Sequence, residues 1–427
     1  MRSAAMGVLF WLALPALGGW PSAARAEEPD PVTWTISGEA RFRPEWRDDA
    51  DLDAGADDDR RLGFMRLRLG VGAAWKDRLR LFVQAQDSRV AGEEPTTATG
   101  TRNLDLHQGY LDLRLTTDET VRLRVGRQEL KYGDERMIGA FGWDNVGRSF
   151  DGVRLRWTRG RSTVDAFAAQ EASVSDPITS ATTGSDLYGV VAQWAPRAGS
   201  EVEATWLEWD SRLAGAGEIP LTAGTSRVDA LSVRVKDRRG PWDGLVEAAV
   251  ERGRMGGDDL RARAAAVQTG WSFGQAAVVR VFAGYDCATG DEDPGDGERG
   301  EFFNFFPTNH PHYGFMDYEG WRNLRSPHAG VSLRRGRHTL QAKAHRFDLD
   351  EARGPWKSAG GAVLGHDPAG SSGRRVGSEV DLTWRYAWME DTVVEAGASR
   401  FRPGEFARAT RGSAASDWAY VMLTATF

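Results

Sequence analysis

The chain has 427 residues, with 54 Lys or Arg against 61 Asp or Glu and a formal net charge of −7. This length suffices for one large barrel or for two to three ordinary domains. The sequence lacks a glycine-rich phosphate loop and a basic, aromatic-rich motif, which argues against nucleic-acid binding. Cys287 is the only cysteine, and this excludes an internal disulfide.

The N-terminus has the three parts of a secretory signal peptide. Arg2 gives a positive start, residues 8–17 are an apolar run, and residues 24–26 (Ala-Arg-Ala) form a small-x-small cleavage site. We therefore expect residues 1–26 to be cleaved and residues 27–427 to form a single domain. No later stretch approaches the roughly 18 apolar residues that a spanning helix needs. This leaves a soluble exported protein or an outer-membrane β-barrel.

The mature sequence begins with three segments of period two. Residues 34–43, 65–75 and 79–86 each alternate apolar residues with arginine or other polar residues. This pattern is typical of β-strands with one apolar face. Only a short polar segment around Lys76 separates the second strand from the third, which predicts a tight turn.

The next strand shows a change of parity. The leucines between 111 and 115 share one face, whereas Leu104 and Leu106 fall on the other. One extra residue near His107 would produce this shift, so we predict a β-bulge there.

Residues 121–157 show the hairpin pattern most clearly. Two segments, 121–125 and 153–157, alternate Val, Leu or Trp with Arg, and the polar, Gly-rich residues 131–149 lie between them. In a soluble sandwich the apolar face would point into the core. In a membrane barrel it would point to lipid, and the arginines would face the lumen.

The rest of the chain alternates short and long connections. Short turns are predicted near residues 159–161, 196–199, 237–241, 273–275, 334–337 and 388–391. Long polar loops are predicted near residues 171–185, 210–225, 252–259, 287–327, 349–373 and 402–416. Short periplasmic turns and long extracellular loops are typical of outer-membrane barrels. We therefore predict an all-β fold, a transmembrane antiparallel up-and-down β-barrel of about 18 strands.

The C-terminus supports the barrel interpretation. Residues 419–427 alternate and end on the aromatic Phe427. A strand that runs to the last residue must pair in lipid, so we expect it to close on the first strand. Several tryptophans fall near expected strand ends, as interfacial girdles require, although core packing in a soluble protein is the alternative. These are Trp34, Trp75, Trp157, Trp206 and Trp271.

If the apolar face meets lipid, the lumen side of the first six strands is rich in arginine. The expected lumen positions are Arg41, Arg43, Arg66, Arg68, Arg78, Arg80, Arg114, Arg122, Arg124, Arg154 and Arg156. Such a wall attracts anions and binds carboxylates through the planar guanidinium fork. The alternative is that these arginines only pair with lumen acids, as in a non-selective porin. Candidate partners farther along the chain are Glu201, Glu203, Glu379 and Asp381.

Few residues suggest catalysis or metal binding. Asp134, Glu135 and Asp144 lie in one loop and would be the carboxylates of an enzyme that acts on polysaccharide or lipid. His310 and His312 are the only close histidine pair, with no evident third ligand, which favours a packed loop. The acidic loops near residues 48–59 and 291–296 are candidate Ca²⁺ sites beside lipopolysaccharide, although solvated negative loops are the simpler interpretation. We otherwise expect no cofactor and no resident metal.

Four motifs resemble the alginate export family of outer-membrane barrels. They are LHQGYLDLR at 106–114, VGRQELKYGDERMIG at 125–139, WDNVGRSFDGVRLRW at 143–157 and FFPTNHPHYGFMD at 305–317. The resemblance implies an 18-stranded monomeric barrel whose arginine-lined constriction passes an anionic uronate polysaccharide out of the periplasm. It also marks Arg127, Arg136 and Arg148 as motif positions on the expected substrate path.

The expected function is therefore an outer-membrane channel for an alginate-like uronate polymer or related organic anions. Its expected surroundings are outer-membrane lipid, lipopolysaccharide and periplasmic export partners. The alternatives are a non-selective porin and, less favoured, an outer-membrane enzyme. We also expect residues 131–149 to fold over or into the mouth of the barrel and to help form its constriction.

Overall fold

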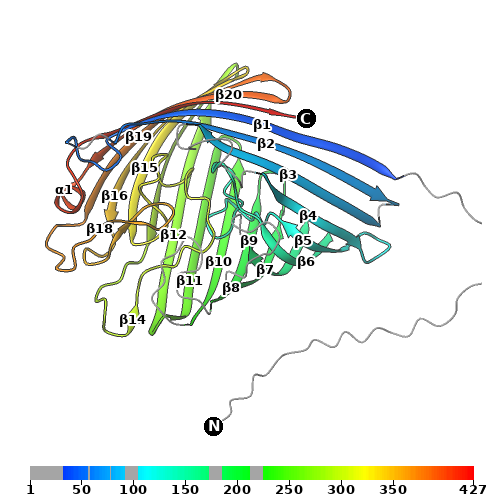
Figure 1. Cartoon of the computed structure of the whole chain (residues 1–427), viewed down its shortest axis with the longest axis horizontal. Coiled ribbons are helices and arrows are strands. Elements are labelled where there is room, and N and C mark those ends of the chain that lie inside the picture. The colour runs from blue at the N-terminus through cyan, green and yellow to red at the C-terminus, as the bar shows by residue number, and fades with distance from the viewer. Residues whose placement is uncertain (1–31, 56–57, 77, 92–103, 173–184, 212–224) are drawn as a thin grey trace, which may run out of the picture. The chain divides into compact units, whose positions relative to one another are not determined.

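The computed structural model describes residues 32–427 apart from 56–57, 77, 92–103, 173–184 and 212–224 (Figure 1). The predicted signal peptide lies outside the described residues. In the described part of the chain, no helix is long and apolar enough to cross a membrane.

The sequence alternation produces a closed antiparallel barrel of 18 strands, which confirms the predicted fold class. Each strand pairs with the next along the chain (Figure 1). The strands of the wall are β1 (Thr33–Asp48), β2 (Arg60–Trp75), β3 (Leu79–Ala91), β4 (Leu104–Arg114), β5 (Val121–Gln128), β6 (Phe150–Arg159), β7 (Ser162–Glu171), β8 (Ser185–Trp194), β9 (Glu201–Ser211), β10 (Ser226–Arg239), β11 (Trp242–Met255), β12 (Asp258–Phe273), β13 (Ala277–Ala288), β15 (Leu324–Arg335), β16 (His338–Leu349), β19 (Arg375–Met389), β20 (Thr392–Pro403) and β21 (Ser416–Thr426).

The barrel closes between its first and last strands, as the C-terminal pattern predicted. β21 pairs antiparallel with β1, and Gly38 N donates a hydrogen bond to Phe427 O over 3.0 Å. Figure 1 shows blue β1 and red β21 side by side where the barrel closes. Closure leaves no strand edge unpaired in lipid.

The long loops carry the remaining elements. β14 (Glu298–Arg299) pairs in parallel with β12, and β17 (Trp356–Lys357) pairs with β18 (Val363–Gly365). The short helix α1 (Glu405–Thr410) lies between β20 and β21. These elements lie within the long connections between wall strands, which are on the extracellular side of an outer-membrane barrel.

The alternation of turn lengths is confirmed except at one position. Between β11 and β12 a two-residue turn, Gly256-Gly257, replaces the loop that we predicted near residues 252–259. Both strands continue through that polar stretch, and Met255 pairs with Asp258. Where strands extend past the membrane both faces meet water, so polarity no longer marks the end of a strand.

The predicted bulge in β4 is confirmed. Gln84 pairs with Gln108 and Ala85 pairs with Leu106, so His107 is the extra residue. The shift moves the following leucines to the outer face of the wall.

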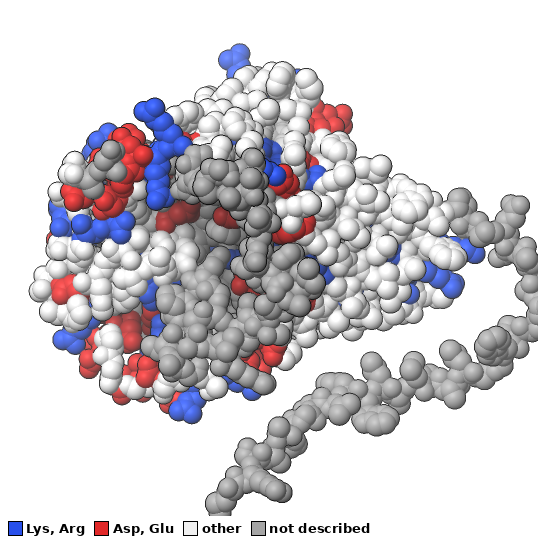
Figure 2. All heavy atoms as spheres, viewed as in Figure 1, with Lys and Arg blue, Asp and Glu red and all other residues white. Residues whose placement is uncertain are grey.

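The faces of the wall are divided as a membrane barrel requires. Large apolar side chains are exposed on the outside, and Trp34, Trp75, Trp157, Trp206 and Trp271 are all among them. The charged residues gather around the end with the long loops, while the flank of the strands is largely uncharged (Figure 2). The barrel is therefore apolar where lipid would contact it.

Candidate functional site

Two loops fold inward and pack against each other inside the barrel. We call them the plug, which consists of residues 129–149 between β5 and β6 and residues 300–323 between β13 and β15. Ile138 forms a parallel bridge with Phe306, and Gly139 N donates to Phe306 O over 2.8 Å. The expectation that residues 131–149 fold into the mouth is thus confirmed.

An apolar core holds the two halves of the plug together. Ile138, Tyr313 and Trp321 are at most 1% exposed. Phe150, at the start of β6, packs edge-on against Phe306 with ring centroids 5.4 Å apart. Burial of aromatic side chains of this size contributes strongly to stability. The centre of the lumen at this level is therefore occupied by packed side chains.

Arginines of the first two strands bind the main chain of the plug. Arg41 donates hydrogen bonds to Gly142 O over 2.9 Å and to Asp144 O over 2.7 Å. Arg66 donates to the same two oxygens, over 3.2 and 2.9 Å. Two neighbouring guanidinium groups thus share two carbonyl acceptors, and Glu39 balances part of their charge by pairing with Arg66 over 2.7 Å.

The adjacent arginines bind the same segment. Arg43 donates to Trp143 O over 2.5 Å, and its guanidinium lies 4.0 Å from the Trp143 ring centroid. Arg68 donates to Val146 O over 3.0 Å. Residues 142–146 are therefore held by four arginines of β1 and β2. Charged donors make strong hydrogen bonds, so these arginines anchor the plug.

The arginines at the motif positions are also engaged in structural contacts. Arg148 pairs with Glu171 over 2.9 Å and donates to Pro307 O over 3.0 Å, which ties both halves of the plug to β7. Arg136 pairs with Asp286 of β13 over 3.3 Å.

Arg127 lies on a different face from the other predicted positions. It occurs in the same outward register as Val125, whose side chain is exposed on the outer surface. Arg127 pairs with Asp151 over 2.8 Å and donates to Leu106 O over 3.0 Å. The register therefore places Arg127 away from the lumen.

A second group of arginines points inward on the periplasmic side of the plug. Their inward registers lie side by side on neighbouring strands from β3 to β6. We call this group the arginine row, which consists of Arg80, Arg114, Arg122, Arg124, Arg154 and Arg156. The side chains of Arg122 and Arg156 are 35% and 40% exposed, against 4% for Arg66. Arg78 lies beside the row in the turn after β2.

Three carboxylates partly neutralise the arginine row. Asp112 accepts hydrogen bonds from Arg122 over 3.3 Å and from Arg124 over 2.8 Å. Asp165 of β7 accepts from Arg156 over 2.6 Å and from Tyr132 Oη of the plug over 2.8 Å. Glu119 pairs with Arg114. Asp165 thus links the row to the plug, and six guanidinium groups meet three carboxylates.

The residues predicted as distant partners of these arginines bind elsewhere. Glu201 pairs with Arg234, and Glu203 accepts from Gln193 over 2.7 Å. Glu379 accepts from Met316 N over 3.0 Å. Asp381 accepts from Ser399 Oγ over 2.6 Å. None of these contacts reaches the arginine row, so its six guanidinium groups outnumber the carboxylates that pair with them in the described part of the chain.

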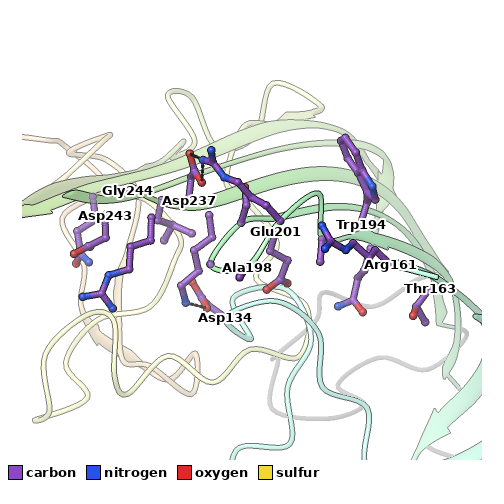
Figure 3. Close-up of a pocket in the computed structure, with 18 of the residues that line it drawn as sticks. Asp134, Arg161, Thr163, Trp194, Ala198, Glu201, Asp237, Asp243 and Gly244 are labelled. Carbon is purple, nitrogen blue, oxygen red and sulfur yellow. Dashed lines mark hydrogen bonds and ion pairs between the residues drawn. The ribbon is translucent and has the colours of Figure 1, made fainter. Parts of the chain in front are cut away.

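A pocket of about 1010 Å³ lies against β7 to β13 (Figure 3). Asp134 projects into it from the plug and pairs with Lys236 over 3.0 Å. Asp243 accepts from Arg280 over 2.8 Å, and Asp237 pairs with Arg197. Five basic and four acidic side chains line the pocket. The pocket is therefore close to neutral, unlike the arginine row.

The three candidate catalytic acids each make contacts within the plug or with the wall. Asp134 forms the ion pair described above. Burial raises the pKa of Asp134, but the charges of Arg234 and Lys236 outweigh this effect, so its pKa lies below the usual value. Glu135 accepts from Thr308 Oγ1 over 2.6 Å, which joins the two halves of the plug. Asp144 accepts from Val146 N over 2.8 Å and shapes the segment that the arginines hold.

The histidine pair is packed into the plug. His310 stacks between Trp143 and Phe315, with ring centroids 4.1 and 4.8 Å apart. His312 Nε2 donates to Asp134 O over 2.8 Å. Among the described residues, no three His, Cys, Asp or Glu side chains are arranged to hold a metal ion. Calcium binding at the acidic loops stays a prediction.

Sequence reasoning missed Asp165 and Tyr132, which connect the plug to the wall. Asp165 left a signal, since it interrupts an apolar stretch of β7 and its neighbours Val164 and Ala166 are uncharged. A carboxylate in that register requires a partner inside the lumen. Tyr132 left no such signal.

The sequence profile described as alginate export matches residues 32–421. No curated protein sequence matches the chain. Among solved structures, the chain is similar to Pseudomonas aeruginosa OccK9 (OpdG), with a TM-score of 0.62 and 12% identity over 92% of this chain and 98% of that chain. OccK8 (OprE) and OccK5 (OpdH) of the same organism give TM-scores of 0.61 and 0.59, each at 11% identity and the same coverage. Likeness at these identities shows the fold.

Proposed function

The chain belongs to the alginate export family, a family of outer-membrane channels, and from this premise we propose that it passes an anionic polysaccharide, a uronate polymer like alginate, out of the periplasm. The observation that carries the proposal is the arginine row. Six guanidinium groups face the lumen on the periplasmic side of the plug, where a polymer coming from the periplasm would first meet the wall.

The chemistry of the row suits repeated carboxylates. Arg122 and Arg124 follow one another on the same face of β5, and inward residues of one strand lie about 6.6 Å apart. Neighbouring strands add a spacing of about 4.8 Å across the row. A polymer with one carboxylate per sugar can therefore move from one guanidinium group to the next. Partial exposure and the carboxylates of Asp112 and Asp165 keep each contact weak enough to release.

The plug controls the other half of the path. Its apolar core fills the lumen above the arginine row, so a polysaccharide passes only when the plug moves. The four anchoring arginines, Arg41, Arg43, Arg66 and Arg68, hold the segment that would have to shift. In this proposal the lumen arginines divide into two roles, since those of β1 and β2 bind the plug and those of the row bind the polymer.

The experiment is an ion-selectivity measurement in a planar bilayer with a salt gradient across it. The wild-type channel should prefer anions and should be blocked by oligouronates added on the periplasmic side. Arg122→Glu with Arg156→Glu should abolish the preference and the block, because both side chains are exposed in the lumen. Arg353→Glu, in the exposed loop after β16, is the matched control and should change neither.

A non-selective porin is the second candidate, because the pocket along β7 to β13 has nearly balanced charges, with ion pairs such as Lys236–Asp134 and Arg280–Asp243. Small solutes of either sign would pass such a wall equally well. The same measurement separates the two candidates. Cation preference in the wild type, or selectivity that survives both reversals, would contradict the anion channel.

A further inference from the structure

The outer surface of the barrel has a groove on β15, β16, β19 and β20. An apolar part of about 520 Å³ is lined by Ala342 of β16 on one side of β19 and by Ala396 and Ala398 of β20 on the other. Leu382 and Trp384 of β19 stand between them and are larger. Because Ala342 is lower than the neighbouring Leu340 and Leu382, the wall is hollowed there. Figure 1 shows these strands as neighbours in the yellow-to-orange part of the barrel.

The groove continues to the periplasmic turn between β15 and β16. A second part of about 590 Å³ shares Leu333 and Leu340 with the first. It ends against Arg335, Arg337 and His338. The groove is therefore apolar along the membrane and basic at the membrane surface.

The two arginines at this end lack carboxylate partners among the described residues. Arg337 donates to Trp388 O over 2.8 Å, and Arg335 points outward in register with His338. Neither forms a salt bridge in the described part of the chain, although Glu390 lies in the adjacent turn. At another periplasmic turn, by contrast, Arg197 pairs with Asp237. Two exposed arginines without a carboxylate partner at a membrane surface fit an anionic headgroup.

Aromatic side chains fix the level of the headgroup. His338 stacks on Tyr386 with ring centroids 4.6 Å apart, and Trp384 Nε1 donates to His338 Nδ1 over 3.2 Å. Such rings lie at the boundary between hydrocarbon and headgroups. From His338 to Ala342 the strand rises about 13 Å, comparable to half of a hydrocarbon core of about 30 Å. The groove thus spans one leaflet, the periplasmic one.

We propose that this groove binds a diacyl anionic glycerophospholipid of the periplasmic leaflet, with its phosphate on Arg335 and Arg337 and one acyl chain over Ala342. The charge of the arginines selects the headgroup, and the small side chain of Ala342 leaves room for the chain. This inference does not depend on the polymer path, because the groove lies on the opposite face of the wall from the lumen.

The test is native mass spectrometry of the folded barrel released from detergent with equal amounts of phosphatidylglycerol and phosphatidylethanolamine. The wild type should retain phosphatidylglycerol preferentially. Arg335→Gln with Arg337→Gln should lower that retention about thirtyfold, which corresponds to about 1 kcal/mol for each arginine. Ala342→Trp should also lower it, because the indole fills the groove and leaves both charges in place. Arg159→Gln, at another periplasmic turn, is the control and should change nothing.

Three results would overturn the proposal. One is equal retention of the two lipids by the wild type, and another is undiminished retention by both groove variants. The third is a dimer that Ala342→Trp dissociates, which would assign the groove to a second copy of this chain. Heat-modifiable migration on a gel shows for each variant that the barrel is folded before retention is compared.

Discussion

Arg41 Nη2 lies 2.7 Å from the main-chain oxygen of Asp144, so an arginine of the barrel wall holds the loop that fills the barrel. The same oxygen also accepts from Arg66. A guanidinium group bound to carbonyls in this way is not available to an anion in the lumen. The positively charged wall therefore has one part that anchors the plug and a second part below it, the arginine row.

Arg41→Ala with Arg66→Ala should loosen the plug. The two substitutions remove four hydrogen bonds from charged donors to Gly142 O and Asp144 O. A net loss of about 1.5 kcal/mol already shifts a closed-to-open ratio about tenfold. We expect large openings to become at least about tenfold more frequent in single-channel recordings.

Arg122→Ala is the matched control for this effect. Its guanidinium pairs with Asp112 and, among the described residues, forms no hydrogen bond or ion pair with the plug. It should weaken anion preference and leave the frequency of large openings unchanged. Equal opening frequencies in all three proteins would show that these arginines do not anchor the plug.

Asp112→Asn should make the channel more selective for anions. Asp112 is one of three carboxylates that partly neutralise the arginine row, and it accepts hydrogen bonds from both Arg122 and Arg124. Its removal leaves more positive potential in the lumen, and the effect should diminish as salt screens it. The reversal potential in a salt gradient measures the change. Asp293→Asn, in an exposed loop, should have no effect; a decrease in anion preference for Asp112→Asn would contradict the role of the row.

The sequence predicted the barrel well because the two-residue period reports directly which face meets lipid. The bulge at His107 and the closure at Phe427 both followed from that parity. The missed turn at Gly256-Gly257 shows where this reasoning ends. Beyond the membrane both faces of a strand are polar, and its pattern resembles that of a loop.

The division of the arginines could not be predicted in the same way. Parity places Arg41 and Arg122 equally in the lumen. What separates them is a contact between Arg41 and Gly142, 101 positions apart in the sequence. Such a contact depends on how the loop crosses the barrel, and the local pattern carries no information on it. The motif around Trp143 indicated that the segment matters without indicating what it binds.

His312 should make plug opening depend on pH. Burial lowers the pKa of His312 well below 6.5, and the charges of Arg136 and Lys343 lower it further. Below pH 6.5 a displaced plug, with His312 in water, takes up a proton that the packed plug does not. Acidification should therefore destabilise the closed plug by up to about 1.4 kcal/mol per pH unit. The opening frequency of the wild type relative to His312→Gln should rise, by up to about tenfold, between pH 6.5 and pH 5.5.

Glu319 provides a control with the opposite sign. Burial raises the pKa of Glu319 well above 4.5, so the packed plug keeps a proton that a displaced plug loses as pH rises. The opening frequency of the wild type relative to Glu319→Gln should therefore rise with pH. If the ratio of the wild-type opening frequency to that of His312→Gln stays constant between pH 7.5 and pH 5.5, the role of His312 is refuted.

Gly126→Ala should weaken the barrel wall beside the plug. Gly126 has a φ of +121°, and a Cβ there would lie 2.3 Å from Gly109 O on the neighbouring strand. Gly126 and Gly109 both belong to paired strands, so neither residue can move aside without breaking the β4–β5 pairing. Strain of this kind costs about 1–3 kcal/mol. The temperature at which the folded band disappears in heat-modifiability gels should fall. Gly142→Ala should leave it unchanged, since no atom lies within 4 Å of that Cβ position and the carbonyl still reaches Arg41. Equal midpoints for the two variants would show that the wall adjusts at Gly126.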